Sequence, residues 1–377
     1  MSKIKFYRLD KILATGADYC MILGERSNGK TYSVLEYGLN KWFNSNFTHS
    51  MAIIRRFDED FRGEKGKKVF TSFVENGMVS RITNKMFNGI YYYSMKWYLC
   101  RYNEQGKREF TQEEPFAIGF SLSSEEHYKM LSFPDIKTIL FDEFITRGYY
   151  LTDEFIKFTS LLSTIIRLRD DLKIFMLANT INKYSPYFAE MGIFNIKNQK
   201  KGTIDIYTYG ESNLKVAVEY SDFETKDKKS NKYFAFNNPK LEMIKNGGWE
   251  IDIYPHLPYK YLPKEIIFTY FIEFDNDILQ CEIISHKEEN KIYNFTFIHR
   301  KTTKIKDIDK NNNIVFSQEI DVNNRRRRFI NKPYDRIGKK IWEFYLKEKV
   351  FYQCNDLGEI VRNYLKWCKR GVDNGVY

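Results

Sequence analysis

The sequence is poor in the two residue types that most often build metal and disulfide sites. Its five cysteines are scattered and show no CxxC spacing, which argues against structural zinc or a disulfide framework and favours a reducing cytoplasm. Its five histidines are equally dispersed, so no histidine-based metal site is predicted. No apolar run reaches the length of a bilayer span, and the segment Met1 to Lys11 lacks a signal-peptide core. We therefore expect an intracellular protein with no membrane partner.

The composition of the 377 residues is that of a globular protein with a basic surface. Hydrophobic residues make up 43% and aromatic residues 17% of the chain, the opposite of the bias that produces disorder. This length is enough for two domains with separate cores. The formal net charge is +11, which is suggestive of a polyanionic partner but is also found in basic proteins that bind no nucleic acid.

The first 219 residues are predicted to form an α/β domain with a parallel-type central sheet. Short apolar runs indicate buried strands at Tyr19–Leu23, Met51–Ile54, Lys137–Phe141 and Leu172–Leu177. Helices are expected from about Gly29 and over Asp153–Ile166, so strands and helices alternate. We interpret the aromatic segment from about Ile90 to Phe120 as an inserted hairpin. Ligands of such sheets bind where the strands end.

The remainder of the chain has a different texture. Residues 220–258 are rich in charged and Asn residues and contain the turn signal Asn246-Gly247-Gly248, so we predict a linker region there. Residues 259–377 are predicted to form a smaller, basic α+β domain. Its expected elements are a three-stranded meander and two amphipathic helices, at Glu265–Phe274, Ile278–Ser285, Lys291–His299, Tyr334–Lys349 and Asp356–Lys369.

A phosphate-binding loop is predicted directly after the first strand. The eight residues that match GxxxxGK[ST] are Gly24, Glu25, Arg26, Ser27, Asn28, Gly29, Lys30 and Thr31. The backbone N–H groups of such a loop surround phosphate oxygens, and the following helix directs its positive end at them. Lys30 would reach the β- and γ-phosphates of ATP, and the Thr31 hydroxyl would ligate Mg²⁺. The strand before and the helix after the motif make a chance match in a turn a poor alternative.

Hydrolysis needs further groups, and the ends of two later strands supply candidates. Asp142 and Glu143 follow the strand ending at Phe141; Asp142 would hold Mg²⁺, and Glu143 would act as general base toward the attacking water. Asn179 ends the next strand and is placed to sense the γ-phosphate. The alternatives are a solvated acidic strand end and an ordinary turn Asn.

Two arginines, Arg167 and Arg169, follow the helix that precedes the last of these strands. An exposed arginine at this point could reach the γ-phosphate in a neighbouring subunit and act as an arginine finger in trans. The alternative is a charge that stabilises the carboxyl end of the helix. The sequence leaves the two interpretations open.

Basic clusters are the candidates for contact with DNA. They are Lys65, Lys67 and Lys68 in the first domain and Arg325, Arg326, Arg327 and Arg328 in the second, with Lys96, Arg101, Lys107 and Arg108 of the inserted hairpin. Incidental charge on a flexible loop is the alternative for the arginine cluster. For metal-dependent DNA cleavage, the sequence offers only Glu273, Asp275, Asp277 and Glu282 nearby, which form no convincing ligand set for two metal ions.

These motifs together resemble the DNA-packaging ATPases, or encapsidation proteins, of small phi-29-like short-tailed phages, which are related to the ATPase domains of large terminases. The features that match are GERSNGKT at 24–31, the doublet Arg55-Arg56, FDEF at 141–144, IIRLR at 165–169 and LANT at 177–180. They keep the family's order and cover roughly Tyr19 to Phe188. The chain is longer than expected for the family, mainly in the hairpin and the linker.

The resemblance implies roles and partners that the residues alone do not. Arg26 is similar to the arginine inside the phosphate loop of packaging ATPases, Arg167 to the trans-acting finger, Asn179 to the coupling motif, and Arg55 to a basic residue near the nucleotide at a subunit boundary. It implies a P-loop NTPase fold of the ASCE, terminase-like kind and an RNase H-like second domain that has lost its nuclease activity. It also implies a homomeric ring, usually a pentamer, on the portal vertex of an empty procapsid in the host cytoplasm, and it leaves open whether a packaging RNA is a further partner.

The leading hypothesis from the sequence is therefore an ATP- and Mg²⁺-dependent motor that translocates double-stranded DNA during viral genome packaging. One alternative is a terminase-like ATPase whose second domain cuts DNA. Another is a nucleotide-binding scaffold in which ATP only orders an assembly. A generic helicase is disfavoured because the further helicase motifs are not recognisable in the chain.

Overall fold

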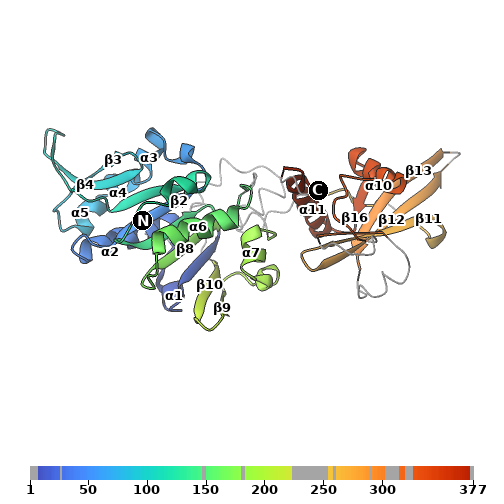
Figure 1. Ribbon diagram of the computed structural model, residues 1–377, viewed down its shortest axis with the longest axis horizontal. Coiled ribbons are helices and arrows are strands. Elements are labelled where there is room, and N and C mark those ends of the chain that lie inside the picture. The colour runs from blue at the N-terminus through green and yellow to red at the C-terminus, as the bar shows by residue number, and fades with distance from the viewer. Residues whose placement is uncertain are drawn as a thin grey trace, which may run out of the picture. The chain divides into compact units, whose positions relative to one another are not determined.

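The structure, a computed structural model, consists of two compact units, Met1–Glu250 and Ile251–Tyr377, each built around its own sheet (Figure 1). Within them it describes residues 7–25, 28–146, 150–179, 183–222, 254–257, 260–288, 291–301, 314–318 and 326–373. The predicted linker region, 220–258, lies almost entirely outside these residues, so the predicted domain boundaries stay a prediction. No helix in the described part of the chain has the length and apolarity needed to cross a bilayer.

A ten-stranded sheet forms the centre of the first unit. Six strands run parallel in the order β6-β2-β7-β8-β1-β10. Their bounds are β1 Tyr19–Gly24, β2 Ser50–Arg55, β6 Ala117–Ser121, β7 Ile136–Asp142, β8 Lys173–Asn179 and β10 Leu214–Tyr220. The antiparallel strands are β3 Gly89–Tyr93, β4 Lys96–Tyr102, β5 Arg108–Thr111 and β9 Ile204–Tyr209. The α/β class and the parallel central sheet predicted from the apolar runs are thereby confirmed.

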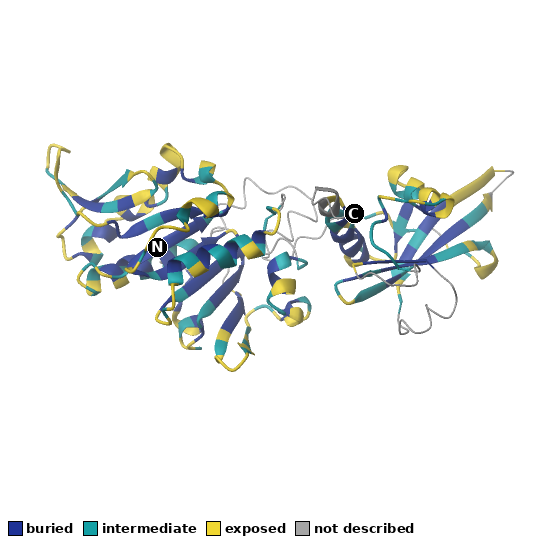
Figure 2. Cartoon of the chain, viewed as in Figure 1, coloured by how far each residue is buried: buried dark blue, intermediate teal, exposed yellow. Residues whose placement is uncertain are grey.

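Helices cover both faces of this sheet, so its central strands are buried almost throughout (Figure 2), and this burial on two sides is why they are apolar. Met21 and Leu23 of β1 pack in one core cluster with residues of α6 (Glu154–Ile166). Cys20 and Ile22 pack in a second cluster with residues of α2 (Lys30–Asn44). Successive side chains of a strand point to opposite faces, so the run YCMIL serves two cores. The strand that leads to the phosphate loop is therefore fixed from both sides.

Short helices connect these elements. Their bounds are α1 Asp10–Leu13, η1 Asp58–Asp60, α3 Glu64–Lys68, α4 Thr71–Glu75, α5 Met78–Ile82, η2 Leu122–Tyr128, α7 Pro186–Glu190 and η3 Phe194–Lys197, where η marks a 3-10 helix.

The segment from Ile90 to Phe120 is more than the inserted hairpin that we expected from its aromatic alternation. A hairpin of β3 and β4 turns at Ser94-Met95, both with positive φ, and β5 pairs with β4 after the turn at Asn103 to Gly106. The last part of the segment belongs to the central sheet itself, because β6 pairs in parallel with β2. The prediction was wrong for β6 because a five-residue apolar strand carries no local sign of its partner.

The second unit contains a six-stranded sheet in the order β15-β14-β11-β12-β13-β16. The bounds are β11 Ile266–Phe274, β12 Asp277–Glu288, β13 Lys291–Arg300, β14 Ile314–Ser317, β15 Arg326–Arg327 and β16 Val350–Tyr352, with η5 Pro263–Glu265, α10 Arg336–Leu346 and α11 Asn355–Asp373. The first three strands form the predicted antiparallel meander, and β14 and β15 run parallel to β11. The predicted α+β class of this unit is thereby confirmed, whereas its RNase H-like identity stays a prediction.

Candidate nucleotide-binding site

The phosphate loop turns from β1 into α2 at a position that requires glycine. Gly29 has φ of 91° and immediately precedes the first residue of the helix, Lys30. Only glycine adopts this left-handed conformation without a steric cost, which explains the second glycine of the motif. Arg26 and Ser27 lie outside the described residues, so their predicted contacts with nucleotide stay predictions.

The side chain of Lys30 is buried within the loop that precedes it. Its Nζ donates to the backbone oxygen of Glu25 at 2.5 Å and to Oδ1 of Asn28 at 3.2 Å. Burial lowers the pKa of Lys30 to about 8, against the attraction of Asp142 and Glu25. The amide Nδ2 of Asn28 is buried and has no hydrogen-bond partner among the described residues. An ammonium group and an unused amide donor together fit an anionic ligand with several oxygen acceptors.

The predicted magnesium ligands, Thr31 and Asp142, lie next to each other although 111 positions separate them in the chain. The Thr31 hydroxyl donates to the Asp142 carboxylate, with 3.3 Å to each oxygen. Thr31 is in the first turn of α2, and Asp142 ends β7. A hydroxyl and a carboxylate are ligands that suit Mg²⁺ in phosphate-binding sites. In the described part of the chain no group of three or more His, Cys, Asp and Glu side chains converges to hold a metal by itself.

A cavity of about 440 Å³ brings the separate motifs together. Its lining residues are Asn28, Gly29, Lys30, Thr31, Tyr32, Asp142, Glu143, Leu177, Ala178 and Asn179. They come from the phosphate loop, the end of β7 and the end of β8, and Asn179 lies beside Gly24 in the register of β8 and β1. The parallel strand order therefore places the acidic pair and Asn179 opposite the loop. Tyr32 was not singled out in the sequence, since an aromatic residue at helical spacing is more often part of the core.

Arg55 is in contact with the acidic pair. Its guanidinium donates to Asp142 at 2.6 Å and to Glu143 at 2.9 Å. Arg55 ends β2, the neighbour of β7 in the sheet. The arginine does not line the cavity, so its predicted contact with nucleotide would be made through or beside these carboxylates. Its charge offsets that of two adjacent acids.

The neighbouring residue Arg56 has a second role that the sequence did not reveal. It is buried, forms a bidentate ion pair with Glu154 of α6, and donates to the backbone oxygens of Glu143 and Phe144. Only the doublet itself pointed to this position. Nothing local in the sequence pairs Arg56 with an acid almost a hundred residues away.

The structure separates the two candidate finger residues, Arg167 and Arg169. The guanidinium of Arg169 donates to five backbone oxygens, those of Phe133, Pro134, Ile136, Ile165 and Ile166. Arg167 is exposed, and within the described part of the chain its side chain donates once, to the oxygen of Leu131 at 2.6 Å. It lies near Tyr19, at the start of β1, whereas Lys30 follows the end of that strand. Six residues of strand span about 16 Å, so Arg167 does not reach the cavity of its own subunit.

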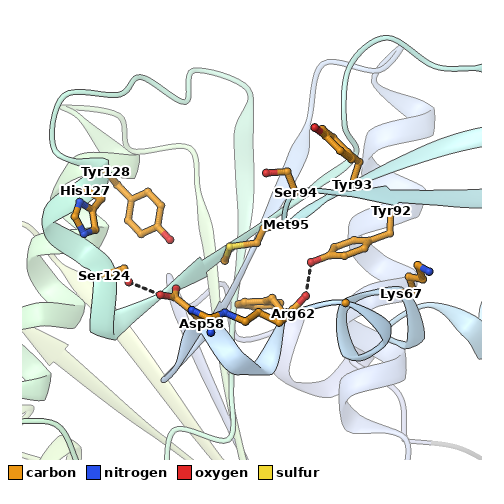
Figure 3. A pocket seen from close by; sticks show the side chains of 12 residues that line it. Asp58, Arg62, Lys67, Tyr92, Tyr93, Ser94, Met95, Ser124, His127 and Tyr128 are labelled. Atoms are coloured by element: carbon orange, nitrogen blue, oxygen red, sulfur yellow. Dashed lines mark hydrogen bonds between the residues drawn. The ribbon is translucent and has the colours of Figure 1, made fainter.

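A second, more open cavity of about 640 Å³ follows the ends of β2 and β6 (Figure 3). Its lining combines the basic side chains of Arg62, Lys67 and His127 with the rings of Tyr92 and Tyr128. In Figure 3, Tyr92 donates to the backbone oxygen of Phe61 and Ser124 donates to Asp58.

The predicted DNA contacts of α3 are exposed, and one of them lines this cavity. Lys67 faces it, and the same lysine pairs with Glu64 at 2.7 Å. Lys65 and Lys68 are exposed on the same short helix. These placements leave the lysines accessible to a polyanion.

The described arginines of the cluster in the second unit contact acidic or aromatic side chains of the same unit and do not form one exposed basic patch. Arg326 pairs with Glu273 at 2.6 Å and its side chain is only 12% exposed, while Arg327 pairs with Asp335 at 2.5 Å. Arg328 lies over the rings of Phe329 and Trp367. Arg325 is outside the described residues. The sequence pattern overstated this patch because it does not show which charges the fold neutralises.

Glu273, the carboxylate considered for metal-dependent cleavage, is also engaged. It accepts from Arg326 and from the Ser317 hydroxyl at 3.0 Å. Glu282 accepts from Tyr261 and Gln280 and pairs with His299 at 3.3 Å. The two carboxylates are therefore held by donors of the protein, an arrangement that suits structural acids.

The fold and the cavity define the class of the protein: an α/β domain with a phosphate loop between the first strand and helix of a largely parallel sheet, followed by an α+β unit. Residues 1–234 match the family described as podovirus DNA encapsidation protein (Gp16), well over half of the chain. The chain belongs to this family.

Individual relatives are distant in sequence. The DNA packaging proteins of Bacillus phages PZA and phi29 are each 21% identical to the chain over 210 residues, which are 55% of this chain and 55% of each relative. The match thus spans about half the length of these relatives. A solved structure of the bacteriophage phi29 genome packaging motor assembly contains a chain of the same fold. It is 15% identical, with a TM-score of 0.56 over 97% of this chain and 98% of that one.

Proposed function

We propose that the chain is an ATP-hydrolysing motor that translocates double-stranded DNA into a viral procapsid. The observation that carries the proposal is the 440 Å³ cavity in which the phosphate loop, Asp142, Glu143 and Asn179 meet. Membership of the encapsidation family supports the same function, since two relatives are described as DNA packaging proteins.

We assign each polar side chain around the cavity a separate role in ATP hydrolysis. Lys30 would exchange its contacts with Glu25 and Asn28 for the β- and γ-phosphate oxygens of ATP. Glu143, 63% exposed beside the cavity, would accept a proton from the attacking water as general base. Asn179 would sense the γ-phosphate from the end of β8. Arg26 would add a positive charge within the loop, as implied by the family resemblance.

The donor set fits a magnesium ion between nucleotide and protein. Thr31 and Asp142 present a hydroxyl and a carboxylate that already touch, and they would hold the ion. Bound Mg²⁺ would neutralise charge on the phosphate oxygens during phosphoryl transfer. Asp142 would then exchange part of its contact with Arg55 for the ion, and Arg55 would remain next to Glu143.

A ring of identical subunits would complete each site. Arg167 is exposed, lies at the opposite end of β1 from the phosphate loop, and has one backbone partner among the residues that the structure describes. We propose that it stabilises the γ-phosphoryl transition state of the adjacent subunit. The proposed assembly is a ring, pentameric in keeping with the family resemblance, at the portal vertex of the procapsid. A packaging RNA is a further partner in the same proposal.

Contacts with DNA would be made to the sugar-phosphate backbone, since a motor has to grip any sequence. The exposed lysines Lys65, Lys67 and Lys68 are the proposed contacts in the first unit. Arg326 and Arg327 would need to break their ion pairs with Glu273 and Asp335 to bind a phosphate. We therefore propose that the second unit makes fewer contacts with the DNA backbone than the sequence indicated.

The test is steady-state ATP hydrolysis by the wild type and by Glu143→Gln, each with and without double-stranded DNA and empty procapsids. We expect DNA and procapsids to stimulate the wild type, and Glu143→Gln to bind ATP but not turn it over. Hydrolysis that is independent of Glu143 would overturn the assignment of the base. Binding without any hydrolysis by the wild type would instead identify a nucleotide-dependent scaffold.

A further inference from the structure

The backbone of the proposed general base, Glu143, has a conformation that its own residue type disfavours. Its φ is 59°, in the left-handed region where a side chain normally meets a steric penalty. Such a conformation persists only where the surroundings impose it. One constraint is a backbone hydrogen bond to the neighbouring strand: the N–H of Phe144 donates to the oxygen of Leu177 in β8 at 3.2 Å. A second constraint holds the two carbonyl groups of this turn.

That second constraint is the guanidinium of Arg56. One terminal nitrogen donates to the backbone oxygen of Glu143 at 3.3 Å, and the other donates to that of Phe144 at 3.0 Å. The side chain is 8% exposed, so these bonds form away from water, where their strength is greatest. The planar fork of arginine binds two carbonyl groups and a carboxylate at once, which the point charge of lysine does not reproduce.

Glu154 fixes Arg56 in turn. Both carboxylate oxygens accept from the guanidinium at 2.7 Å, and the side chain is 2% exposed. Glu154 also accepts from the Tyr187 hydroxyl at 2.9 Å and from the N–H of Leu151 at 2.7 Å. The Tyr150 ring lies over the guanidinium, 5.2 Å from its carbon. This network joins the end of β2, the turn after β7, and helices α6 and α7.

We propose that Arg56 is a positioning residue for Glu143 and that Glu154 is its anchor. Consecutive residues at the end of an extended strand point to opposite sides, so Arg55 and Arg56 have different contacts and different proposed roles. Arg55 touches the carboxylates of the acidic pair, whereas Arg56 holds the backbone that aims one of them. The inference rests on the proposed hydrolysis, since it assigns the support of that reaction's general base.

The kinetic test compares Arg56→Lys and Glu154→Gln with the wild type in steady-state hydrolysis and ATP binding. Small displacements of catalytic groups cost up to about 100-fold in rate, so we expect kcat to fall about 10- to 100-fold in both variants. The affinity for ATP should change less than about twofold, because the hydrogen bonds of Arg56 and Glu154 go to none of the described residues of the phosphate loop. Glu125→Gln is the matched control: Glu125 of η2 is buried and pairs with Lys157 of α6, and this ion pair does not involve the turn after β7.

A second readout does not depend on activity. Hydrogen exchange of the peptide around Phe144 should accelerate in Arg56→Lys and Glu154→Gln and stay unchanged in Glu125→Gln. If the single variants fail to fold, the double variant Arg56→Met with Glu154→Leu replaces the ion pair by apolar groups, which buried sites often tolerate. It should fold and show the same loss of kcat and the same faster exchange.

The outcomes separate the two proposals. A folded variant with unchanged exchange around Phe144, or with faster exchange but wild-type kcat, overturns the positioning role. A wild type that hydrolyses no ATP overturns the proposed function, and hydrogen exchange alone then decides whether Arg56 holds the turn.

Discussion

Replacing Arg167 and Arg169 one at a time should separate catalysis in trans from stability, although the two residues are only two positions apart. Arg167 is exposed and donates one hydrogen bond, to Leu131. Arg169 donates to five backbone oxygens, and these hydrogen bonds connect the end of α6 to the segment that enters β7. The substitutions Arg167→Ala and Arg169→Ala therefore remove the same kind of side chain from opposite environments.

The magnitudes follow from these contacts. A single hydrogen bond at an exposed position contributes about 1 kcal/mol or less to the free energy of unfolding, so Arg167→Ala should leave the melting temperature nearly unchanged. Loss of a trans-acting arginine lowers turnover about 1000-fold or more. Hydrogen bonds from a charged donor contribute about 1.5–3 kcal/mol each and do not add fully, so Arg169→Ala should destabilise the first unit by ~3 kcal/mol or more.

A mixing assay shows whether Arg167 acts across a subunit boundary. Arg167→Ala keeps Glu143, and Glu143→Gln keeps Arg167, so each protein alone is expected to be inactive in turnover while binding ATP. In a mixed ring, a Glu143 from one subunit can meet an Arg167 from the next, and hydrolysis should return in part. Full activity of Arg167→Ala alone would refute the reasoning, and the absence of any recovery on mixing would refute the assignment in trans.

Two further outcomes are expected from the described contacts. Burial lowers the pKa of Lys30 to about 8, whereas a bound phosphate favours the charged form of the lysine. Above pH 8, ATP binding must therefore be accompanied by uptake of a proton. A nucleotide titration should then show the ATP affinity falling up to about tenfold per pH unit. Affinity that stays flat through pH 8 to 9 would contradict this. Glu273→Ala should destabilise the second unit by about 1.5–3 kcal/mol, because it removes a charge-assisted hydrogen bond from Arg326, whose side chain is 12% exposed, and should not alter Mg²⁺- or Mn²⁺-dependent DNA nicking. Nicking lost with Glu273 would instead establish an active nuclease.

The local features of the site were predictable because they depend on short stretches of chain. The phosphate loop needs glycine at a fixed place between a strand and a helix, and Gly29 with its φ of 91° meets that need. Asp142 and Asn179 end apolar strands, and parallel strands end at one edge of a sheet. The sequence therefore predicted which side chains would converge before any strand order was known.

The unpredicted features depend on pairs that are distant in the chain. The strand β6 was assigned to a hairpin because nothing within Ala117–Ser121 indicates β2 as its neighbour. The arginine cluster was interpreted as a phosphate-binding patch because its acidic partners, Glu273 and Asp335, lie outside the cluster. In both cases the residue types indicated a strand or a basic cluster, but the sequence did not indicate which distant residues would pair with it.

The sequence by itself determined the phosphate loop, the alternation of strands and helices, and most of the polar side chains that line the cavity, since hydrophobic spacing and backbone conformation are local properties. The tertiary structure alone decided which charges are neutralised and which remain available. It bound Arg169 to five carbonyl groups, left Arg167 exposed, and gave Arg55 and Arg56 different partners. The physical reason is that burial and ion pairing depend on which distant segments meet, and the spacing of residues along the chain does not encode those meetings.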